Sequence, residues 1–279
     1  MKWGIVTDSG CDLKERDFQN KGVDFTVAAL KIIVDDQEFV DDDNIQISDL
    51  LEGMKNSKET LQTACPAPGD FYEGFKKSDN VLCFTLTGGL SGTYNSARMA
   101  KELMEVDDPS KKIFVCDTKS VAGSEVLMIE KSLELIQAGK SFEEITAELE
   151  IYNKELALVF TMGSYDNLIK TGRMSNFMGS VVKTLNIRLI CVASPEGTVE
   201  TAKKCRGHKT TYNTMVDMMK EKKDLSHATI QIHHCNNEKD SSYIREKIMA
   251  EYPNAKINIV PCKGLTTFYA MDGGILIAY

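Results

Sequence analysis

The chain has 279 residues, of which 42% are hydrophobic and 27% are charged, an ordinary composition for a globular protein with a large core. Its net charge of −8 argues against nucleic acid as the main partner, because an acidic field repels phosphate backbones. Apolar stretches stay well short of the roughly 20 residues that span a bilayer, and the first residues lack the apolar region of a signal peptide, so we expect neither a transmembrane segment nor a leader.

The eight cysteines are spread evenly along the chain, and none of them forms a C-x-x-C pair. Cys83, Cys116 and Cys191 lie inside apolar runs, where a free thiol behaves as a small hydrophobic side chain. We therefore expect reduced thiols and a cytoplasmic protein.

The first half of the chain alternates between strand and helix patterns. Short apolar runs predict strands at residues 2–9, 23–34, 38–43, 81–86 and 112–118. Helix patterns lie at 11–22 and 47–56, and another follows each of the last two strands. This alternation predicts an α/β fold with a parallel sheet.

The second half has a different pattern. Strands are expected at 157–162, 187–194, 228–235, 256–262 and 275–279, with helices at 208–223 and from about Ser241. A turn at residues 195–197 leads into a predicted hairpin strand at 197–207. Tight turns between neighbouring strands favour some antiparallel pairing, so we expect a second α/β domain with a mixed sheet. The predicted domains are residues 1–158 and 159–279.

Ser91 follows an apolar strand and a glycine pair, in the segment FTLTGGLSGTYNSARMA of residues 84–100. One hypothesis is a nucleophile, because hydrolases carry G-x-S-x-G at such a strand-to-helix turn. The segment Gly89-Leu90-Ser91-Gly92-Thr93 lacks the final glycine, and none of the four histidines lies in a motif that would supply a base. A serine hydrolase or transferase is therefore an alternative with weak support.

Ser91 also fits two other roles. Serine suits a helix N-cap, because its oxygen accepts a hydrogen bond from an amide of the first turn. Glycines at 88, 89 and 92 let the backbone approach a ligand, and the helix that follows presents free N–H groups. Such a turn binds carboxylate or phosphate. A phosphorylated metabolite is thus a further candidate ligand.

The segment Thr63-Ala64-Cys65-Pro66 is interpreted as a second loop placed before a helix. Thr63 could cap that helix, with Pro68 in the first turn. Its alternative role is a hydroxyl that faces the same ligand as Ser91.

Other polar groups carry weaker signals. Asp8 ends the first strand, where ligands bind in parallel sheets, but an acid at this place equally often caps a helix. Acidic residues between 35 and 43 lack the spacing of a calcium loop and are interpreted as a solvated loop. His233 and His234 are adjacent on a strand and point to opposite faces, so we expect no shared metal. The basic cluster at 203–209 is either a solvated edge or a docking site for an acidic partner.

Five short motifs occur in order along the chain: IVTDS at 5–9, T-x-x-P at 63–66, LSGTYNSA at 90–97, L-x-x-TGRMS at 168–175 and KCRG at 204–207. Together they resemble the DegV family of bacterial fatty-acid-binding proteins over nearly the whole chain. The resemblance implies a two-domain α/β protein that holds a long-chain fatty acid between its domains, with no catalytic residue, metal or cofactor of its own.

The resemblance also implies roles for particular residues. The carboxylate of the fatty acid would be held by Thr63, by the hydroxyl of Ser91 and by backbone amides around Gly92. Some family members present that carboxylate to a separate kinase subunit, which phosphorylates it to an acyl-phosphate. The residues expected to face such a kinase are Lys204, Arg206 and Arg173.

The end of the chain departs from the family pattern. The family often ends in H-x-G-P-G-x-x-G, whereas this chain has Tyr269-Ala270-Met271-Asp272-Gly273-Gly274. Tyr269 stands where the family has a histidine that helps to bind the head group. Because a tyrosine hydroxyl can donate a hydrogen bond to a carboxylate, we expect Tyr269 to contact the ligand.

Overall fold

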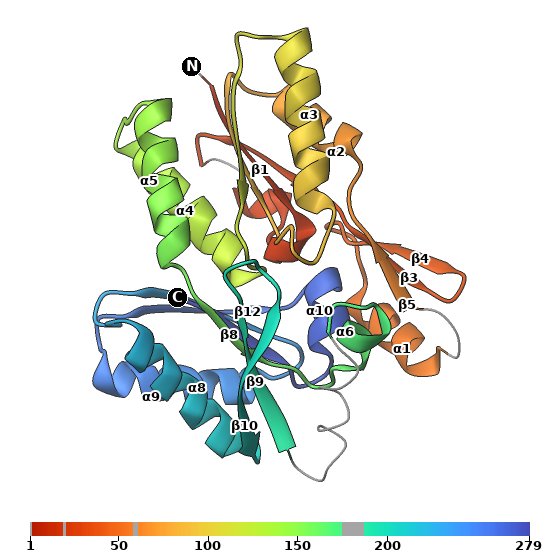
Figure 1. Ribbon diagram of the computed structural model, residues 1–279, viewed down its shortest axis with the longest axis vertical. Helices are drawn as coiled ribbons and strands as arrows, with labels where there is room; N and C mark the ends of the chain where they lie inside the picture. The colour runs from red at the N-terminus through yellow and green to blue at the C-terminus, as the bar shows by residue number, and fades with distance from the viewer. Residues whose placement is uncertain (1, 19–20, 58–60, 175–186) are drawn as a thin grey trace.

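The computed structural model describes residues 2–18, 21–57, 61–174 and 187–279. These residues form a four-stranded, a six-stranded and a three-stranded sheet, with helices packed against them. Figure 1 shows the four-stranded sheet above the six-stranded one, and the three-stranded sheet at one side. The predicted residue Ser175 of the fourth motif lies outside the described residues.

The four-stranded sheet is parallel, as predicted, with the order β2-β1-β6-β7. Its strands are β1 (Trp3–Asp8), β2 (Asp24–Ala28), β6 (Asn80–Thr85) and β7 (Lys112–Asp117). Its helices are α2 (Pro68–Phe75), α3 (Thr93–Asp107), α4 (Gly123–Gln137) and α5 (Phe142–Glu155). Alternate residues of β1 enter different cores: Val6 packs with α2 and α3, and Ile5 packs with α4 and α5. Helices therefore cover both faces of the sheet.

The three-stranded sheet is antiparallel, with the order β4-β3-β5. It consists of β3 (Lys31–Val34), β4 (Gln37–Val40) and β5 (Leu61–Ala64), and α1 (Ile47–Asn56) packs against it. The single strand predicted at 23–34 is wrong, because the chain leaves the parallel sheet after Ala28 and enters this one at Lys31. The apolar run is continuous because both strands and the connecting Leu30 contribute buried side chains.

The helix predicted at 11–22 is also wrong. The described part of that range holds two short 3₁₀ segments, η1 (Ser9–Cys11) and η2 (Glu15–Phe18). Asp8 caps η1 through its side chain, and Asp12 ends it in a left-handed conformation with φ of 64°. A helix cannot continue through a residue held in that conformation.

The six-stranded sheet is mixed, as predicted, with the order β10-β9-β8-β13-β11-β12. Its strands are β8 (Leu158–Thr161), β9 (Ile187–Ala193), β10 (Val199–Arg206), β11 (Thr229–His234), β12 (Lys256–Pro261) and β13 (Ile275–Ala278). Only β11 and β12 pair in parallel among these described strands. The helices are α6 (Asp166–Lys170), α8 (His208–Lys222), α9 (Glu238–Glu251) and α10 (Gly264–Ala270). The predicted hairpin is confirmed, because β10 returns antiparallel to β9.

Helix α4 joins the two larger sheets, since it contacts β6 on one side and β11 and β13 on the other. Its first residue allows this close packing: a Cβ atom at Gly123 would lie 2.6 Å from Cβ of Gln231 and 3.0 Å from Cβ of Ala278. The strands of the parallel sheet all precede residue 118, and those of the six-stranded sheet all follow residue 157. The division into domains at 158/159 stays a prediction.

We expect the substitution Gly123→Ala to lower the free energy of unfolding by about 1–3 kcal/mol, because the added methyl group overpacks the contact between α4 and the six-stranded sheet. Urea denaturation measures the change. Gly69→Ala is the matched control: Gly69 lies in α2, and a Cβ atom added there would have nothing within 4 Å, so this change should leave stability equal or slightly higher. Equal stability of both variants would contradict the prediction.

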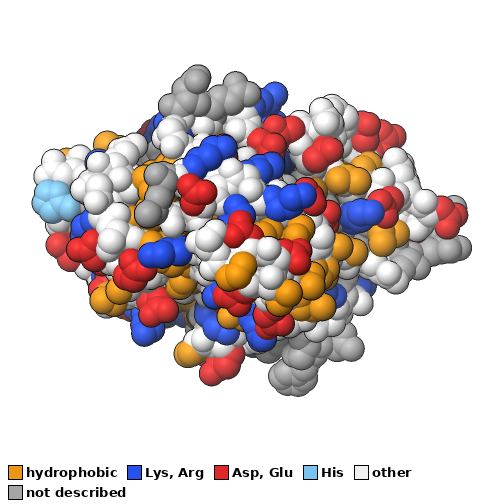
Figure 2. Space-filling model, turned by 90° about the horizontal axis from the view of Figure 1, so that it is seen from above, with side chains coloured by type: hydrophobic (Ala, Val, Ile, Leu, Met, Phe, Trp, Pro, Cys, Tyr) orange, Lys and Arg blue, Asp and Glu red, His pale blue; other side chains and the backbone are white. Residues whose placement is uncertain are grey.

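The surface combines charges of both signs with a few exposed apolar side chains. Figure 2 shows acidic and basic side chains interspersed over the upper face, with hydrophobic atoms between them. On α3, Met99, Leu103 and Val106 are exposed at helical spacing. None of the helices in the described residues has the length and hydrophobicity that a bilayer crossing requires.

Candidate ligand-binding cavity

A cavity lies where the loop after β6 meets strands β8 to β10 and helix α10. It contains about 790 Å³ of empty space, its open mouth included. Its lining is mainly apolar and includes Leu158, Phe160, Val199, Leu265 and Leu276. The size and lining suit an apolar ligand of the kind that protein pockets commonly hold.

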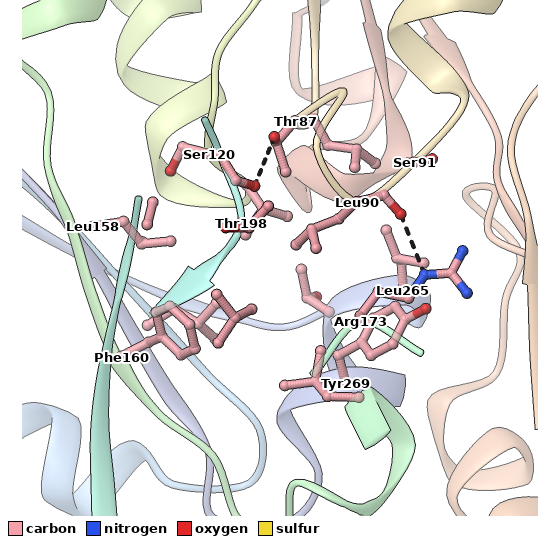
Figure 3. A pocket seen from close by; sticks show the side chains of 18 of the residues that line it. Thr87, Leu90, Ser91, Ser120, Leu158, Phe160, Arg173, Thr198, Leu265 and Tyr269 are labelled. Carbon is pink, nitrogen blue, oxygen red and sulfur yellow. Dashed lines mark hydrogen bonds between the residues drawn. The ribbon is translucent and has the colours of Figure 1, made fainter. Parts of the chain in front are cut away.

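One side of the cavity carries polar groups from four separate parts of the chain. Thr63 from β5, Ser91 from the turn before α3, Arg173 from the residues after α6 and Tyr269 from α10 all line it. The hydroxyls of Thr63 and Tyr269 lie 3.0 Å apart, so they form a hydrogen bond. Figure 3 shows Ser91, Arg173 and Tyr269 on the same side of the cavity, opposite Leu158 and Phe160. The structure therefore brings together the predicted residues Thr63, Ser91 and Tyr269.

The prediction that Thr63 lies in a loop is wrong. Thr63 belongs to β5 and pairs with Ile32 of β3. It does not cap α2 either, since the N-cap of that helix is Ala67, whose backbone N–H donates to Asp70. A strand residue is held in place by its ladder partners, so the Thr63 hydroxyl has a well-defined direction.

Ser91 lies one residue before the N-cap of α3, which is Gly92. Its Oγ accepts a hydrogen bond from the backbone N–H of Thr93 (3.3 Å) and lies 2.8 Å from Thr93 Oγ1. The predicted cap is therefore wrong by one residue, although Ser91 still binds an amide of the first turn. Within the described parts of the chain, the N–H of Gly92 has no acceptor. The turn thus offers a hydroxyl and a free amide next to the cavity.

The loop that holds Ser91 is fixed by the turn between β9 and β10. Thr87 Oγ1 donates a hydrogen bond to the carbonyl of Gly197 (2.8 Å) and accepts one from the N–H of Gly89 (3.0 Å). A Cβ atom at Gly89 would lie 2.6 Å from the carbonyl oxygen of Glu196. Glycine at 89 is therefore required by this close approach of two backbones.

Arg173 places a positive charge beside the Ser91 turn. Its Nε donates to the carbonyl of Leu90 (3.2 Å), and its Nη1 donates to the carbonyl of Thr171 (2.6 Å). No carboxylate of the described residues forms an ion pair with it. The family resemblance predicted that Arg173 faces a partner. In the structure Arg173 lines the cavity, and its role in docking stays a prediction. A guanidinium there attracts an anionic group bound at the turn.

The geometry gives no base for a nucleophilic Ser91. None of the cavity-lining residues of the described chain is a histidine. His233 is buried elsewhere, with its Nδ1 2.6 Å from Asp12 Oδ2. The hydrolase hypothesis therefore lacks its second residue.

Known proteins resemble this chain along its whole length. A family model described as "Uncharacterised protein, DegV family" matches residues 2–279. The chain belongs to the DegV family. The DegV domain-containing protein spr0652 of Streptococcus pneumoniae (strain ATCC BAA-255 / R6) is 38% identical over 279 residues, covering 100% of this chain and 99% of that protein.

Two solved DegV-type structures are similar to this one and contain fatty acids. The Fatty Acid Kinase (Fak) B3 protein of Streptococcus pneumoniae, loaded with linoleic acid, has a TM-score of 0.96 and 38% identity and covers 100% of this chain and 99% of its own. A DegV family protein from Eubacterium eligens, loaded with heptadecanoic acid, has a TM-score of 0.93 and 31% identity, with 99% and 98% coverage. The predicted DegV-like α/β fold is confirmed, with a parallel sheet from the first part of the chain and a mixed sheet from the second.

Of the three basic residues predicted to face a partner, Lys204 and Arg206 do not line the cavity of this DegV chain. Lys204 and Arg206 are exposed on β10, which is an edge strand of the six-stranded sheet. They pair with Leu189 and Ile187 of β9. Their role in docking stays a prediction.

Two buried carboxyl groups near the end of β1 and after β4 hold backbone amides. Asp8 accepts hydrogen bonds from the N–H groups of Gly10 and Leu86, each at 2.8 Å, and burial raises its pKa to about 7. Asp41 lies in the segment interpreted as a solvated loop, but it is fully buried, so that interpretation is wrong for this residue. Burial raises the pKa of Asp41 to about 6. Neither residue lines the cavity, and the described residues contain no cluster of metal-binding side chains.

Helix α10 was not predicted from the sequence, although it supplies Leu265, Thr266 and Tyr269 to the cavity. Only Tyr269 was singled out, through the family resemblance. The helix is short and follows closely after a strand, so its helical periodicity is weak. Pro261 and Gly264 were the available signals for a break and a new element.

Proposed function

We propose that this protein binds one long-chain fatty acid in the cavity and has no catalytic activity of its own. The carboxylate lies against Thr63, Ser91, the amide of Gly92 and Tyr269, and the acyl chain extends along the apolar lining. The single observation that carries this proposal is that the hydroxyls of Thr63, Ser91 and Tyr269 lie at one apolar cavity. The fatty acids in the two similar DegV structures support it.

The energetics suit such a ligand. Burial contributes about 0.8 kcal/mol per methylene, so a tail of about sixteen carbons supplies on the order of 12 kcal/mol before the cost of ordering. The tail therefore dominates affinity. A carboxylate is tolerated at the polar side of the cavity only when its oxygen lone pairs accept hydrogen bonds. The hydroxyls, the amide and the Arg173 guanidinium can donate those hydrogen bonds. The polar end thus mainly sets orientation.

We further propose that the protein acts in the cytoplasm and presents the bound carboxylate to a separate kinase subunit. The similar pneumococcal protein is named a Fatty Acid Kinase B3 protein, which supports this role. The exposed Lys204 and Arg206 would dock an acidic surface of the kinase. Arg173 would stay beside the carboxylate, where its charge can also stabilise an acyl-phosphate.

Extraction of the purified protein with organic solvent, followed by mass spectrometry, tests the proposed ligand. We expect a saturated or monounsaturated fatty acid at about one equivalent per chain. Protein stripped of lipid should bind added palmitate or oleate again. A protein that carries no fatty acid and ignores added palmitate and oleate would contradict the proposal.

A further inference from the structure

The first turn of α10 is held by two buried carboxylates from the other half of the chain. Asp41 Oδ1 accepts from the N–H of Gly264, and its Oδ2 accepts from the N–H of Leu265, each at 2.9 Å. Asp12 accepts from the N–H of Lys263 (2.8 Å) and from the hydroxyl of Thr266. A helix start leaves its first amides without partners inside the helix, and here the two aspartates satisfy them.

Glycine at position 264 allows this contact. A Cβ atom there would lie 2.6 Å from Asp41 Oδ1 and 2.7 Å from its Cγ, which is closer than real Cβ contacts. Asp41 itself is anchored, because its backbone N–H donates to the carbonyl of Leu30 (2.9 Å). The carboxylate therefore connects two rigid parts of the backbone.

The same three-stranded sheet holds the other end of α10. Asp41 directly follows β4, and Thr63 lies in β5, with β3 between these strands. Tyr269 is four residues after Leu265, so both side chains share one face of the helix, and both line the cavity. The Tyr269 hydroxyl meets Thr63 at 3.0 Å. The helix is thus attached to one small sheet at both ends, through Asp41 and through Thr63.

We propose that Asp41 is a positioning residue for the polar end of the cavity: by holding the first turn of α10 against the three-stranded sheet, it sets the Tyr269–Thr63 pair that receives the ligand carboxylate. This inference rests on the proposed function. Without the Asp41 contact only Asp12 holds the start of the helix, through Lys263 and Thr266, so the amides of Gly264 and Leu265 lose their acceptors and Tyr269 can shift relative to Thr63. The apolar lining from β8, β9 and β13 stays in place. Loss of the Asp41 contact should therefore weaken binding of the carboxylate more than binding of the acyl tail.

The test compares two ligands with the same chain, palmitate and methyl palmitate, which lacks the negative charge. Displacement of a fluorescent fatty acid gives both affinities, and their ratio is the readout. Asp41→Asn replaces an acceptor oxygen by an amide group that cannot accept from an N–H. Gly264→Ala displaces the carboxylate without changing charge. We expect the preference for palmitate to fall at least tenfold in each variant while circular dichroism stays native.

The control is Asp36→Asn, which removes an equal charge from an exposed residue and should keep the wild-type ratio. Both Asp41→Asn and Gly264→Ala are tested, so that if one of them does not fold the other still tests the positioning role. A palmitate preference that survives in the folded variants, or affinities that fall equally for both ligands, would overturn the positioning role alone. A wild-type protein that binds neither ligand would overturn the proposed function, and the inference with it.

Discussion

The double variant Thr63→Val and Ser91→Ala should bind palmitate about 100-fold more weakly than the wild type, or worse. Each hydrogen bond to a charged group contributes about 1.5–3 kcal/mol, and the variant removes the two hydroxyls that we propose bind the carboxylate. Valine keeps the shape of threonine, so packing in β5 changes little. Isothermal titration calorimetry with lipid-free protein measures the affinity.

The control for this prediction is Ser120→Ala. Ser120 also lines the cavity, but Figure 3 shows it on the other side from Ser91 and Tyr269. Its hydroxyl bonds to Ser124 at 2.7 Å, so it has a partner within the protein. We expect its removal to change palmitate affinity by less than about threefold. An unchanged affinity of the double variant would refute the assignment of Thr63 and Ser91 to the carboxylate, even if the acyl tail lies in the cavity.

The second large effect concerns stability and pH. Burial raises the pKa of Asp8 to about 7 and that of Asp41 to about 6, from an ordinary 3.8, and it raises the pKa of Glu125 well above its usual range. Between the pKa values of the unfolded and the folded states, these carboxyl groups therefore hold their protons in the folded protein and have lost them in the unfolded chain. Stability should rise as pH falls from 8 to 5, by about 2–4 kcal/mol. This added stability is lost as the pH rises through the folded-state pKa values.

Urea denaturation at several pH values checks this expectation. His234 works in the opposite direction below about pH 6.5, because burial lowers its pKa. The variant Asp8→Asn isolates the carboxyl contribution: it should flatten the slope between pH 8 and 6, whereas Asp36→Asn should keep it. A stability that is level or falls over this range in the wild type would show that these groups are ionised in the folded protein.

Local signals predicted those parts of the fold that depend on nearby residues. Helix α1 has the predicted bounds, 47–56, because its apolar spacing and the start at Ile47 lie within one short segment. Strands β1, β6 and β7 are recognisable as apolar runs for the same reason. The Ser91 turn was also visible, since glycines and a serine between a strand and a helix are a short-range pattern.

Contacts between distant residues decided the rest. The run at 23–34 is largely apolar, and only pairing shows that β2 joins β1 whereas β3 joins β4 and β5. Asp41 looks like one acid among several in a loop, because the amides that justify its burial come from α10, 223 residues away for Gly264. Burial of a carboxylate depends on such partners, and composition does not contain them.

The sequence by itself determined the α/β class, the Ser91–Gly92 turn and, through the family motifs, Thr63 and Tyr269 as members of one site. Only the tertiary structure placed the hydroxyls of Thr63 and Tyr269, 206 residues apart, at 3.0 Å, and added Arg173 beside Ser91. Periodicity and capping act over one or two turns of chain, so they can be recognised along the sequence. A binding site is made where strands and loops from different sheets meet, and those meetings exist only once the chain has folded.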